Sequence, residues 1–507
     1  MDTSDRSECL EGTRIDYLRT IMEWASFSDR RVLWFHGLAG CGKSTLATSI
    51  ANIFREQGRL GAFVFFNRDV EERNQASNVV RTIAHQLGSF DTRIRTAMAE
   101  AIETIPNIAQ LPLHLQFLRL LVEPLSMLPT TDESIVIVLD ALDECGNASS
   151  RAVLLALLAA ECKRLPSFIR IFITSRTELN IRTAFTNHAH ILVQEMELAS
   201  PSNTRDILLF IRHRMAQIRS GNQSLQFASD WPGLQVTYDL AQRADGLFIW
   251  ASTACLFIDG HDPCRRLEAL LRGDANSLLA LDTLYQTALN SAGQWDDEDF
   301  SSDFRAVMAA ILVARNPLST TAIDNLLLLD RPSLHTISRL GCVLRWRAME
   351  TVQIIHQSFA DFLSSRQRCG SSRWHIDTSL QNEHMLYHCI NYLDRDLKQN
   401  ICNLKLSPAP VNGILPEAMA YASEFWIDHV CSIDAGTTQI ADFLEHFLFR
   451  HLLHWLEVMS IIKKIRVAIT SLRCLLNWLT VKLFILMSCA SLLTIGTDTC
   501  TFSKQAE

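Results

Sequence analysis

Residues 30–45, RRVLWFHGLAGCGKST, decide the fold of this chain. The stretch begins with a short apolar strand, Val32–Phe35, continues into a glycine-rich turn and ends at the start of a helix. The turn, residues 37–44 (GLAGCGKS), fits the phosphate-loop pattern G-x-x-x-x-G-K-[ST]. Because glycine lacks a Cβ, backbone N–H groups can converge on phosphate oxygens there, and the following helix directs its N-terminal amides at the same anion. The stretch therefore predicts an α/β domain that binds a nucleotide.

Two side chains of this loop have predicted roles of their own. Lys43 can reach the β- and γ-phosphates, and Ser44 can offer its hydroxyl to Mg²⁺. The alternative is a chance glycine-rich turn, which the preceding strand and the following helix disfavour, since Leu46, Ile50 and Ile53 share one helical face. The predicted nucleotide-binding residues of the loop are Gly37, Gly40, Cys41, Gly42, Lys43, Ser44 and Thr45.

A second motif, residues 134–144 (SIVIVLDALDE), contains five aliphatic residues in a row, which predict a buried parallel strand. Asp140 ends this strand, at the edge where ligands bind in open α/β sheets, and is predicted to support the Mg²⁺ of the nucleotide. Asp143 and Glu144 follow within one turn, where either could position a water that attacks the γ-phosphate. The alternative for these two acids is that they cap the next helix.

The next predicted strand, residues 169–174, leads into Arg176, which could sense the γ-phosphate or could form a surface ion pair. One strand, residues 61–66, lies between the phosphate loop and Asp140 in sequence, as in the additional-strand P-loop ATPases. The chain has no Asn-Lys-x-Asp motif for reading guanine, which argues against a Ras-like GTPase. The expected cofactors are Mg²⁺ and ATP or ADP, and GTP stays open as an alternative.

Composition limits the other classes of function. The 507 residues are enough for three or four domains. The formal net charge of −8 gives no global basic surface, so no nucleic-acid partner is expected. The fourteen cysteines include no Cys-x-x-Cys pair, which favours reduced, buried thiols over disulfides or a zinc site. Residues 1–12 are polar and acidic and do not match the pattern of a signal peptide, so a cytoplasmic location is expected.

Several motifs together resemble the NACHT subgroup of the STAND nucleotide switches. They are GLAGCGKST (residues 37–45), IVIVLDALDEC (135–145) and IFITSR (171–176). The Asp-x-x-Asp-Glu spacing after the apolar run is the most specific of these features. ADGLFIWAS (244–252) resembles the segment that follows the nucleotide domain in fungal members, and IIHQSFADFL (354–363) resembles the winged-helix signature of NACHT proteins.

The resemblance covers about residues 8–480 and implies a function. Proteins of this kind hold ADP in a closed state, open on exchange for ATP and then self-associate, with slow hydrolysis as the reset. By this likeness His356 would contact the β-phosphate of ADP and latch the closed state; the alternative is a core histidine whose ring nitrogen bonds a carbonyl. Rival functions are a non-catalytic, nucleotide-stabilised scaffold, an AAA-like motor and a degenerate, truncated family member.

The expected fold is an α/β P-loop NTPase domain with a parallel sheet of the additional-strand type, followed by an all-α half that contains a winged helix. The apolar stretch 483–495 is shorter than a membrane span, so no membrane is expected as a partner. Neither an N-terminal effector nor C-terminal repeats are recognised, so separate effector and sensor proteins are expected partners. The predicted divisions are a lead helix (1–30), the nucleotide domain (31–198), a helical domain (199–295), the winged helix (300–368), a C-terminal helical domain (375–482) and a tail (483–507).

Overall fold

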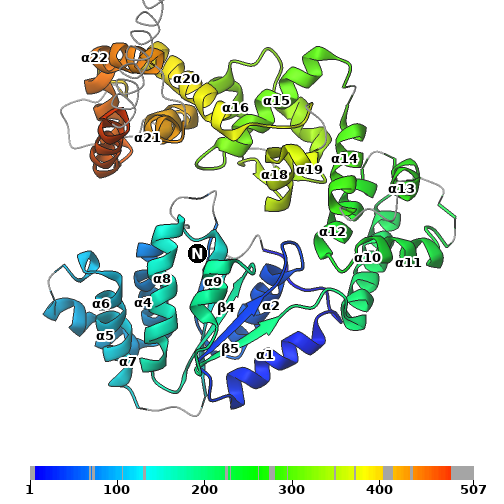
Figure 1. Ribbon diagram of the computed structural model, residues 1–507, viewed down its shortest axis with the longest axis vertical. Coiled ribbons are helices and arrows are strands. Elements are labelled where there is room, and N and C mark those ends of the chain that lie inside the picture. Colours follow the sequence, from blue (N-terminus) through cyan, green and yellow to red (C-terminus); the bar gives the residue numbers. More distant parts are fainter. Residues whose placement is uncertain are drawn as a thin grey trace, which may run out of the picture. The chain divides into compact units, whose positions relative to one another are not determined.

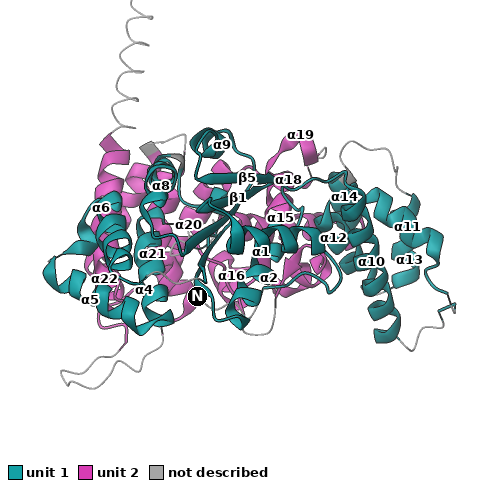
Figure 2. Ribbon diagram, turned by 90° about the horizontal axis from the view of Figure 1, so that it is seen from below, with its two compact units in different colours: residues 1–289 teal, residues 290–507 magenta. Residues whose placement is uncertain are grey.

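The computed structural model divides the chain into two compact units, residues 1–289 and 290–507, which Figure 2 colours separately. Each unit is described by itself. The residues that the structure describes are 6–67, 70, 75–105, 107–129, 133–222, 227, 228, 230–260, 262–272, 280–293, 295–346, 350–369, 373–402, 415–433 and 438–480. The apolar stretch 483–495 lies outside these ranges. Within them, no helix is both long enough and apolar enough to span a membrane.

The first unit is built on a five-stranded parallel sheet with the strand order β2-β3-β4-β1-β5. Strand β4 therefore lies between β1, which leads into the phosphate loop, and β3, which ends in Asp140. This insertion confirms the predicted additional-strand sheet. The strands are β1 (Val32–His36), β2 (Leu60–Phe65), β3 (Ile135–Asp140), β4 (Ile169–Ser175) and β5 (Ile191–Glu195).

Helices cover both faces of the sheet, and alternate side chains of β1 serve the two cores. Leu33 and Phe35 pack with the face that α1 (Ile15–Phe27) and α2 (Lys43–Glu56) cover. Trp34 packs with the opposite face, beneath α4, α8 and α9. Figure 1 shows these two layers on either side of the sheet. Because both faces are covered, β1, β3 and β4 are buried along almost their whole length, and burial does not alternate along them. The edge strand β5 does alternate between buried and exposed residues.

The remaining elements of the first unit are helical. They include a π-helical turn, η3, between two short α-helices, and the 3-10 turn η4 directly after β3. Helices α10 to α13 follow the sheet and include the ADGLFIWAS segment. The bounds are η1 (Ala76–Asn78), α4 (Val79–Phe90), α5 (Thr92–Thr104), η2 (Ile108–Gln110), α6 (Leu113–Phe117), η3 (Leu118–Val122), α7 (Glu123–Ser126), η4 (Leu142–Glu144), α8 (Ala148–Glu161), η5 (Cys162–Arg164), α9 (Leu179–Phe185), α10 (Pro201–Gly221), α11 (Leu234–Arg243), α12 (Phe248–Ile258), α13 (Pro263–Arg272) and α14 (Ala280–Ala292), which ends past the unit boundary.

The second unit is largely helical, as predicted. Its one described sheet is an antiparallel pair, β6 (Leu344–Arg345) and β7 (Gln353–Ile354), and Ser319 makes a further bridge to Thr351. Helices followed by such a hairpin are the order that a winged helix requires, and the winged-helix assignment stays a prediction. The helices are α15 (Glu298–Val313), α16 (Thr320–Leu327), α17 (Leu334–Ile337), η6 (Ser338–Leu340), α18 (Gln357–Ser364), α19 (Arg366–Cys369), α20 (Thr378–Asp396), α21 (Glu417–Cys431) and α22 (Thr438–Ile461), and residues 465–480 are also helical.

A buried polar network joins the helices of the second unit. The backbone N–H of Arg315 donates to the Tyr421 hydroxyl at 3.1 Å, and this hydroxyl lies 2.9 Å from Nε2 of His429. Nδ1 of His429 lies 2.9 Å from Oδ1 of Asn382, to which the Arg315 guanidinium also donates. Since Asn382 Oδ1 can only accept, Nδ1 of His429 carries a proton. His429 is fully buried.

We expect the free energy of unfolding to fall as the pH is lowered through the ordinary pKa of histidine. Burial holds the pKa of His429 well below its usual value. At a pH below that usual value, the unfolded chain binds a proton at His429 and the folded chain does not. The contribution is therefore present above about pH 6.5 and declines by about 1.4 kcal/mol between pH 7.5 and pH 5.5. Urea unfolding, monitored by tryptophan fluorescence at each pH, measures the free energy of unfolding.

Two variants separate the contribution of His429 to this pH dependence from the contributions of other histidines whose pKa is lowered, such as His36 and His388. His429→Gln should make the pH dependence shallower, while costing about 1–3 kcal/mol at neutral pH for the lost buried hydrogen bonds. His384→Gln changes an exposed histidine of α20 and should leave the wild-type dependence in place. Equal dependence in wild type and His429→Gln would contradict the assignment.

Candidate nucleotide-binding site

The phosphate loop connects β1 to α2, at the carboxyl edge of the sheet. Gly40 and Gly42 both adopt the left-handed backbone conformation, with φ of 79° and 97°. A side chain at either position would be strained, so the loop depends on glycine there. Gly42 is also the N-cap residue of α2, which places Lys43, Ser44 and Thr45 in the first helical turn. The structure thus brings the predicted loop residues into the local geometry that a phosphate requires.

Lys43 lies folded across the loop. Its Nζ donates to the carbonyl oxygens of Gly37 at 2.9 Å and Leu38 at 2.8 Å. Cys41 is fully buried, and its Sγ lies 3.7 Å from the same Nζ. Phosphate oxygens would replace the two carbonyls as acceptors for Lys43, because an ammonium group has three donors and no lone pair. A phosphate bound at the loop would therefore gain the donors of Lys43 that bond these two carbonyls in the structure.

Two contacts that the sequence did not predict fix the loop from its outer side. The Arg14 guanidinium donates from Nη2 to the carbonyl oxygen of Cys41 at 2.6 Å, and the N–H of Ile249 donates to that of Gly40 at 2.9 Å. The Arg14 guanidinium also lies 4.4 Å from the ring centroid of Phe248. Burial lowers the pKa of Arg14. These contacts hold the loop carbonyls and so orient the peptide groups on which phosphate binding depends.

Glycine explains how the ADGLFIWAS segment reaches the loop. Gly246 has φ of 78°, and a Cβ there would lie only 2.5 Å from the carbonyl oxygen of Leu198. Asn203 completes this corner, since its side-chain amide donates to the carbonyl oxygens of Leu198 and Gly246. The corner positions the start of α12, and with it Ile249, against Gly40. The sequence motif marked this segment, but its contact with the phosphate loop is long-range and could not be read from spacing.

Asp140 lies at the end of β3 and is fully buried. Its Oδ1 accepts a hydrogen bond from the Thr174 hydroxyl at 2.5 Å, and Thr174 in turn accepts from the N–H of Ala141 at 3.1 Å. Its Oδ2 forms an ion pair with Nη2 of Arg6 at 2.5 Å. A carboxylate on the same sheet edge as Ser44 offers the oxygen ligands that Mg²⁺ prefers, so these residues fit the predicted ion. Neither Arg6 nor the Thr174 bond was predicted.

Asp143 and Arg176, which were predicted to act on water and on the γ-phosphate, pair with each other. The backbone N–H of Arg176 donates to Oδ1 of Asp143 at 2.9 Å, and Nε lies 3.2 Å from Oδ2. Arg176 thus forms an ion pair, as its alternative proposed, but with an aspartate that is almost fully buried, while the Arg176 side chain is 25% exposed. The capping alternative for the acids is wrong, because Asn147 caps α8. Glu144 is half-buried in η4, beside Asp143.

His356 belongs to the second unit, where it is the N-cap residue of α18. The N–H of Ser358 donates to its Nδ1 at 3.1 Å, and the Ser358 hydroxyl lies 2.7 Å from the same nitrogen. The ring is half-buried, which does not match the core histidine that was its alternative. Its predicted contact with ADP stays a prediction.

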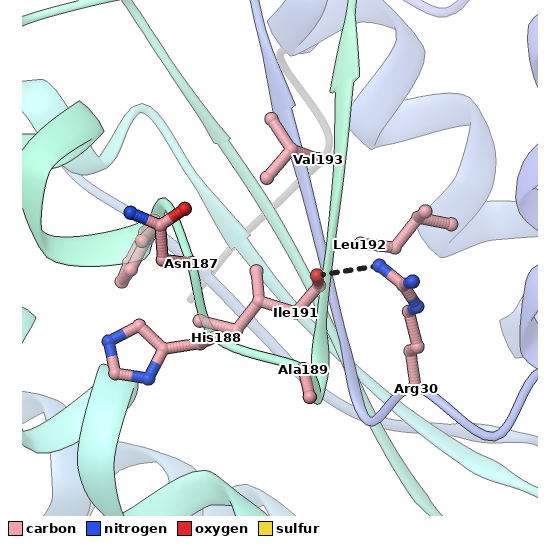
Figure 3. Close-up of a pocket in the computed structure, with 8 residues that line it drawn as sticks. Arg30, Asn187, His188, Ala189, Ile191, Leu192 and Val193 are labelled. Carbon is pink, nitrogen blue, oxygen red and sulfur yellow. Dashed lines mark hydrogen bonds between the residues drawn. The ribbon is translucent and has the colours of Figure 1, made fainter.

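A separate open pocket of about 440 Å³ lies beside β5, lined among others by Arg30, His188 and Val193 (Figure 3). Arg30 donates to the carbonyl oxygen of Ile191 at 3.2 Å across it. Ile191 pairs with Val32 at the start of β1, so the pocket lies at the amino edge of the sheet, opposite the phosphate loop. It is therefore distinct from the nucleotide site. Among the described residues, no cluster of histidine, cysteine and acidic side chains could hold a metal on its own.

The chain is similar to a known family and to a known protein. Residues 17–176 match the family model NPHP3_N, described as Nephrocystin 3, N-terminal. The chain is 24% identical over 491 residues to vegetative incompatibility protein HET-E-1 of Podospora anserina. The match covers 89% of this chain and 35% of the relative. The chain thus spans about a third of the length of that relative.

Solved structures of low similarity were also found. One is a STAND protein with a tetratricopeptide repeat sensor from Pyrococcus horikoshii, with 13% identity, a TM-score of 0.42, and coverage of 94% of this chain and 59% of that one. Another is Cdc6p from Pyrobaculum aerophilum, with 11% identity, a TM-score of 0.33, and coverage of 70% and 94%. The identification rests instead on the phosphate loop, the inserted strand β4, Asp140 with its Asp-x-x-Asp-Glu spacing, and the family and sequence matches. On these grounds the chain has the fold of a P-loop NTPase, and the two sequence matches support its resemblance to the NACHT proteins of the STAND class.

Proposed function

We propose that this protein is a slow, Mg²⁺-dependent ATP/ADP switch in fungal signalling, and that it self-associates when it is loaded with ATP. The observation that carries the proposal is the convergence of the phosphate loop and the buried Asp140 at one edge of the sheet. The relative in Podospora anserina is named a vegetative incompatibility protein, which supports a signalling role over a metabolic one. ATP is preferred over GTP because the sequence lacks a guanine-reading motif.

In this proposal the loop amides and Lys43 bind the phosphates, and Ser44 and Asp140 hold Mg²⁺, which would offset phosphate charge. Glu144 positions the attacking water. Arg176 must leave Asp143 before it can reach a γ-phosphate, because the two side chains pair in this structure. A site whose charged groups are paired with one another needs rearrangement before hydrolysis. This requirement favours a switch that resets slowly over a motor with fast turnover.

The surroundings in which the switch acts are part of the proposal. Several cysteines of the described residues, among them Cys41, Cys145 and Cys162, are buried free thiols, which suits a reducing cytoplasm. We propose self-association and separate effector and sensor proteins as the partners, and no nucleic acid. A nucleotide-stabilised scaffold without hydrolysis is the alternative, and the variants below separate the two.

The protein is expected to purify with ADP bound. Lys43→Ala should weaken ADP binding roughly 10- to 100-fold, because a hydrogen bond to a charged group contributes about 1.5–3 kcal/mol. Ion-exchange chromatography of the supernatant after denaturation identifies and quantifies the nucleotide. Lys163→Ala, an exposed lysine in η5, is the matched control and should retain ADP. Equal ADP content in Lys43→Ala and Lys163→Ala would contradict a role of Lys43 in binding the nucleotide.

Glu144→Gln is expected to abolish most ATP hydrolysis while ATP binding persists. The loss should be about 100-fold or more if Glu144 activates the water, which is the usual contribution of a general base. Single-turnover hydrolysis with radiolabelled ATP is the measurement. Glu161→Gln alters a surface ion pair with Arg164 and should hydrolyse ATP as wild type does. Absence of hydrolysis in the wild type would favour the scaffold.

His356→Ala is expected to accelerate ADP release by about tenfold, the effect of losing one hydrogen bond to a phosphate. The reason is that a latch stabilises the closed state only through a contact made there. Displacement of fluorescent methylanthraniloyl-ADP by excess ADP gives the rate. His335→Ala, an exposed histidine of the same unit, serves as control. Unchanged ADP release in His356→Ala would count against the latch.

A further inference from the structure

The described chain begins with a segment that crosses the nucleotide site. Arg6 forms its ion pair with Oδ2 of Asp140 at 2.5 Å, although the two residues are 134 positions apart in sequence. Nothing in the motifs of the site requires this contact. The arginine side chain is 22% exposed and the aspartate side chain is 0% exposed, so the positive group lies where solvent meets the buried carboxylate.

The platform beneath Arg6 is aromatic and comes from the neighbouring strand. The guanidinium carbon lies 4.4 Å from the ring centroid of Phe65 and 5.7 Å from that of Phe63. Phe65 is the register partner of Asp140 in the β2–β3 ladder, so strand pairing alone places the ring beside the carboxylate. A cation over an aromatic face is stabilised by about 0.5–2 kcal/mol. The ring and the carboxylate together make a binding place for one guanidinium.

A second contact anchors the same segment to the helix that follows the phosphate loop. The N–H of Cys9 donates to the Ser49 hydroxyl of α2 at 2.8 Å. Arg14, a few residues further on, bonds the carbonyl oxygen of Cys41 in the loop. Residues 6–14, which we call the N-terminal strap, therefore contact both halves of the nucleotide site: the metal-supporting acid and the loop backbone.

Arg6 and Mg²⁺ cannot both use Oδ2 of Asp140. Oδ1 already accepts a hydrogen bond from Thr174, so Oδ2, which pairs with Arg6, is the oxygen more available to Mg²⁺. A guanidinium has only N–H donors and no lone pair, so it cannot become a metal ligand and must move aside. Two positive charges on one carboxylate oxygen repel each other strongly where water is excluded. A buried carboxylate is stabilised by a cation, so Arg6 stabilises Asp140 when Mg²⁺ is not bound.

We propose that Arg6 is an internal cation that competes with Mg²⁺ for Asp140, so that loading the site with metal and nucleotide releases the first residues of the N-terminal strap. This inference rests on the proposed Mg²⁺–nucleotide site. Nη1 of Arg6 is buried and makes no hydrogen bond to any residue that the structure describes. A guanidinium that satisfies only part of its donors is displaced at lower cost than one that satisfies them all.

The test measures how much Mg²⁺ the site needs. Fluorescent methylanthraniloyl-ADP at fixed concentration is titrated with MgCl₂ in wild type, Arg6→Ala, Arg6→Lys and the control Arg19→Ala, whose arginine pairs with Asp16 on exposed α1. If Arg6 holds Asp140 in about nine-tenths of the metal-free molecules, Arg6→Ala reaches half-saturation at about tenfold lower Mg²⁺. Arg6→Lys, which keeps the charge but loses the planar fork, should fall between them, and Arg19→Ala should match wild type. Equal midpoints in all four proteins would overturn the proposal.

A second measurement follows the release of the N-terminal strap and does not depend on ATP hydrolysis. Trypsin cleavage after Arg6, followed by mass spectrometry of the intact protein at early times, should be slow in EDTA and faster with MgCl₂ and ADP together. ADP in EDTA should leave cleavage slow, because nucleotide alone does not compete for Asp140. Cleavage that is equally fast in all three conditions contradicts a strap held by Asp140. If neither wild type nor any variant binds the fluorescent nucleotide, the proposed function fails, and this outcome is distinct from binding with unchanged Mg²⁺ dependence.

Discussion

Complete burial of the Asp140 carboxylate is the constraint on which the rest of the site depends. A charge removed from water must be paired or hydrogen-bonded, and the surrounding structure supplies both. Thr174 reaches Oδ1 because β4 is inserted next to β3, and Arg6 reaches Oδ2 across the ring that β2 contributes. The strand order is therefore part of the chemistry, because it decides which side chains neighbour the acid.

The parts of the site that depend on local sequence could be predicted. The strand–loop–helix around Lys43 follows from glycines at left-handed positions and from an apolar run before them, and the structure has it at residues 32–56. Strand β3 and its terminal Asp140 follow from an uninterrupted aliphatic stretch. The placement of β4 could be inferred from strand count and the position of the acid. All of these are properties of short segments whose burial is set by their own composition.

Contacts between distant segments could not be predicted in the same way. Arg6, Arg14 and Ile249 lie far in sequence from the residues that they contact, and spacing along the chain does not reveal these contacts. Asp143 and Arg176 show a subtler limit. Their location at the sheet edge was predicted, but their pairing depends on the geometry of the 3-10 turn η4, where Ala141 takes φ of 60°. Residue type and position in the sequence identified both side chains as candidates for the site. Which side chain each one pairs with depends on the three-dimensional structure.

The two arginines of the N-terminal strap suggest how occupancy of the site could be communicated along the chain. A ligand shifts a conformational equilibrium only when it interacts differently with the two states. Mg²⁺ meets this condition at Asp140, because its binding and the Arg6 contact exclude each other. Arg14 bonds a carbonyl oxygen of the loop, whereas phosphates bind loop amides, so phosphate binding need not break that bond. The strap would then stay attached at Arg14 and come free at Arg6, which makes its first residues the part that responds to metal.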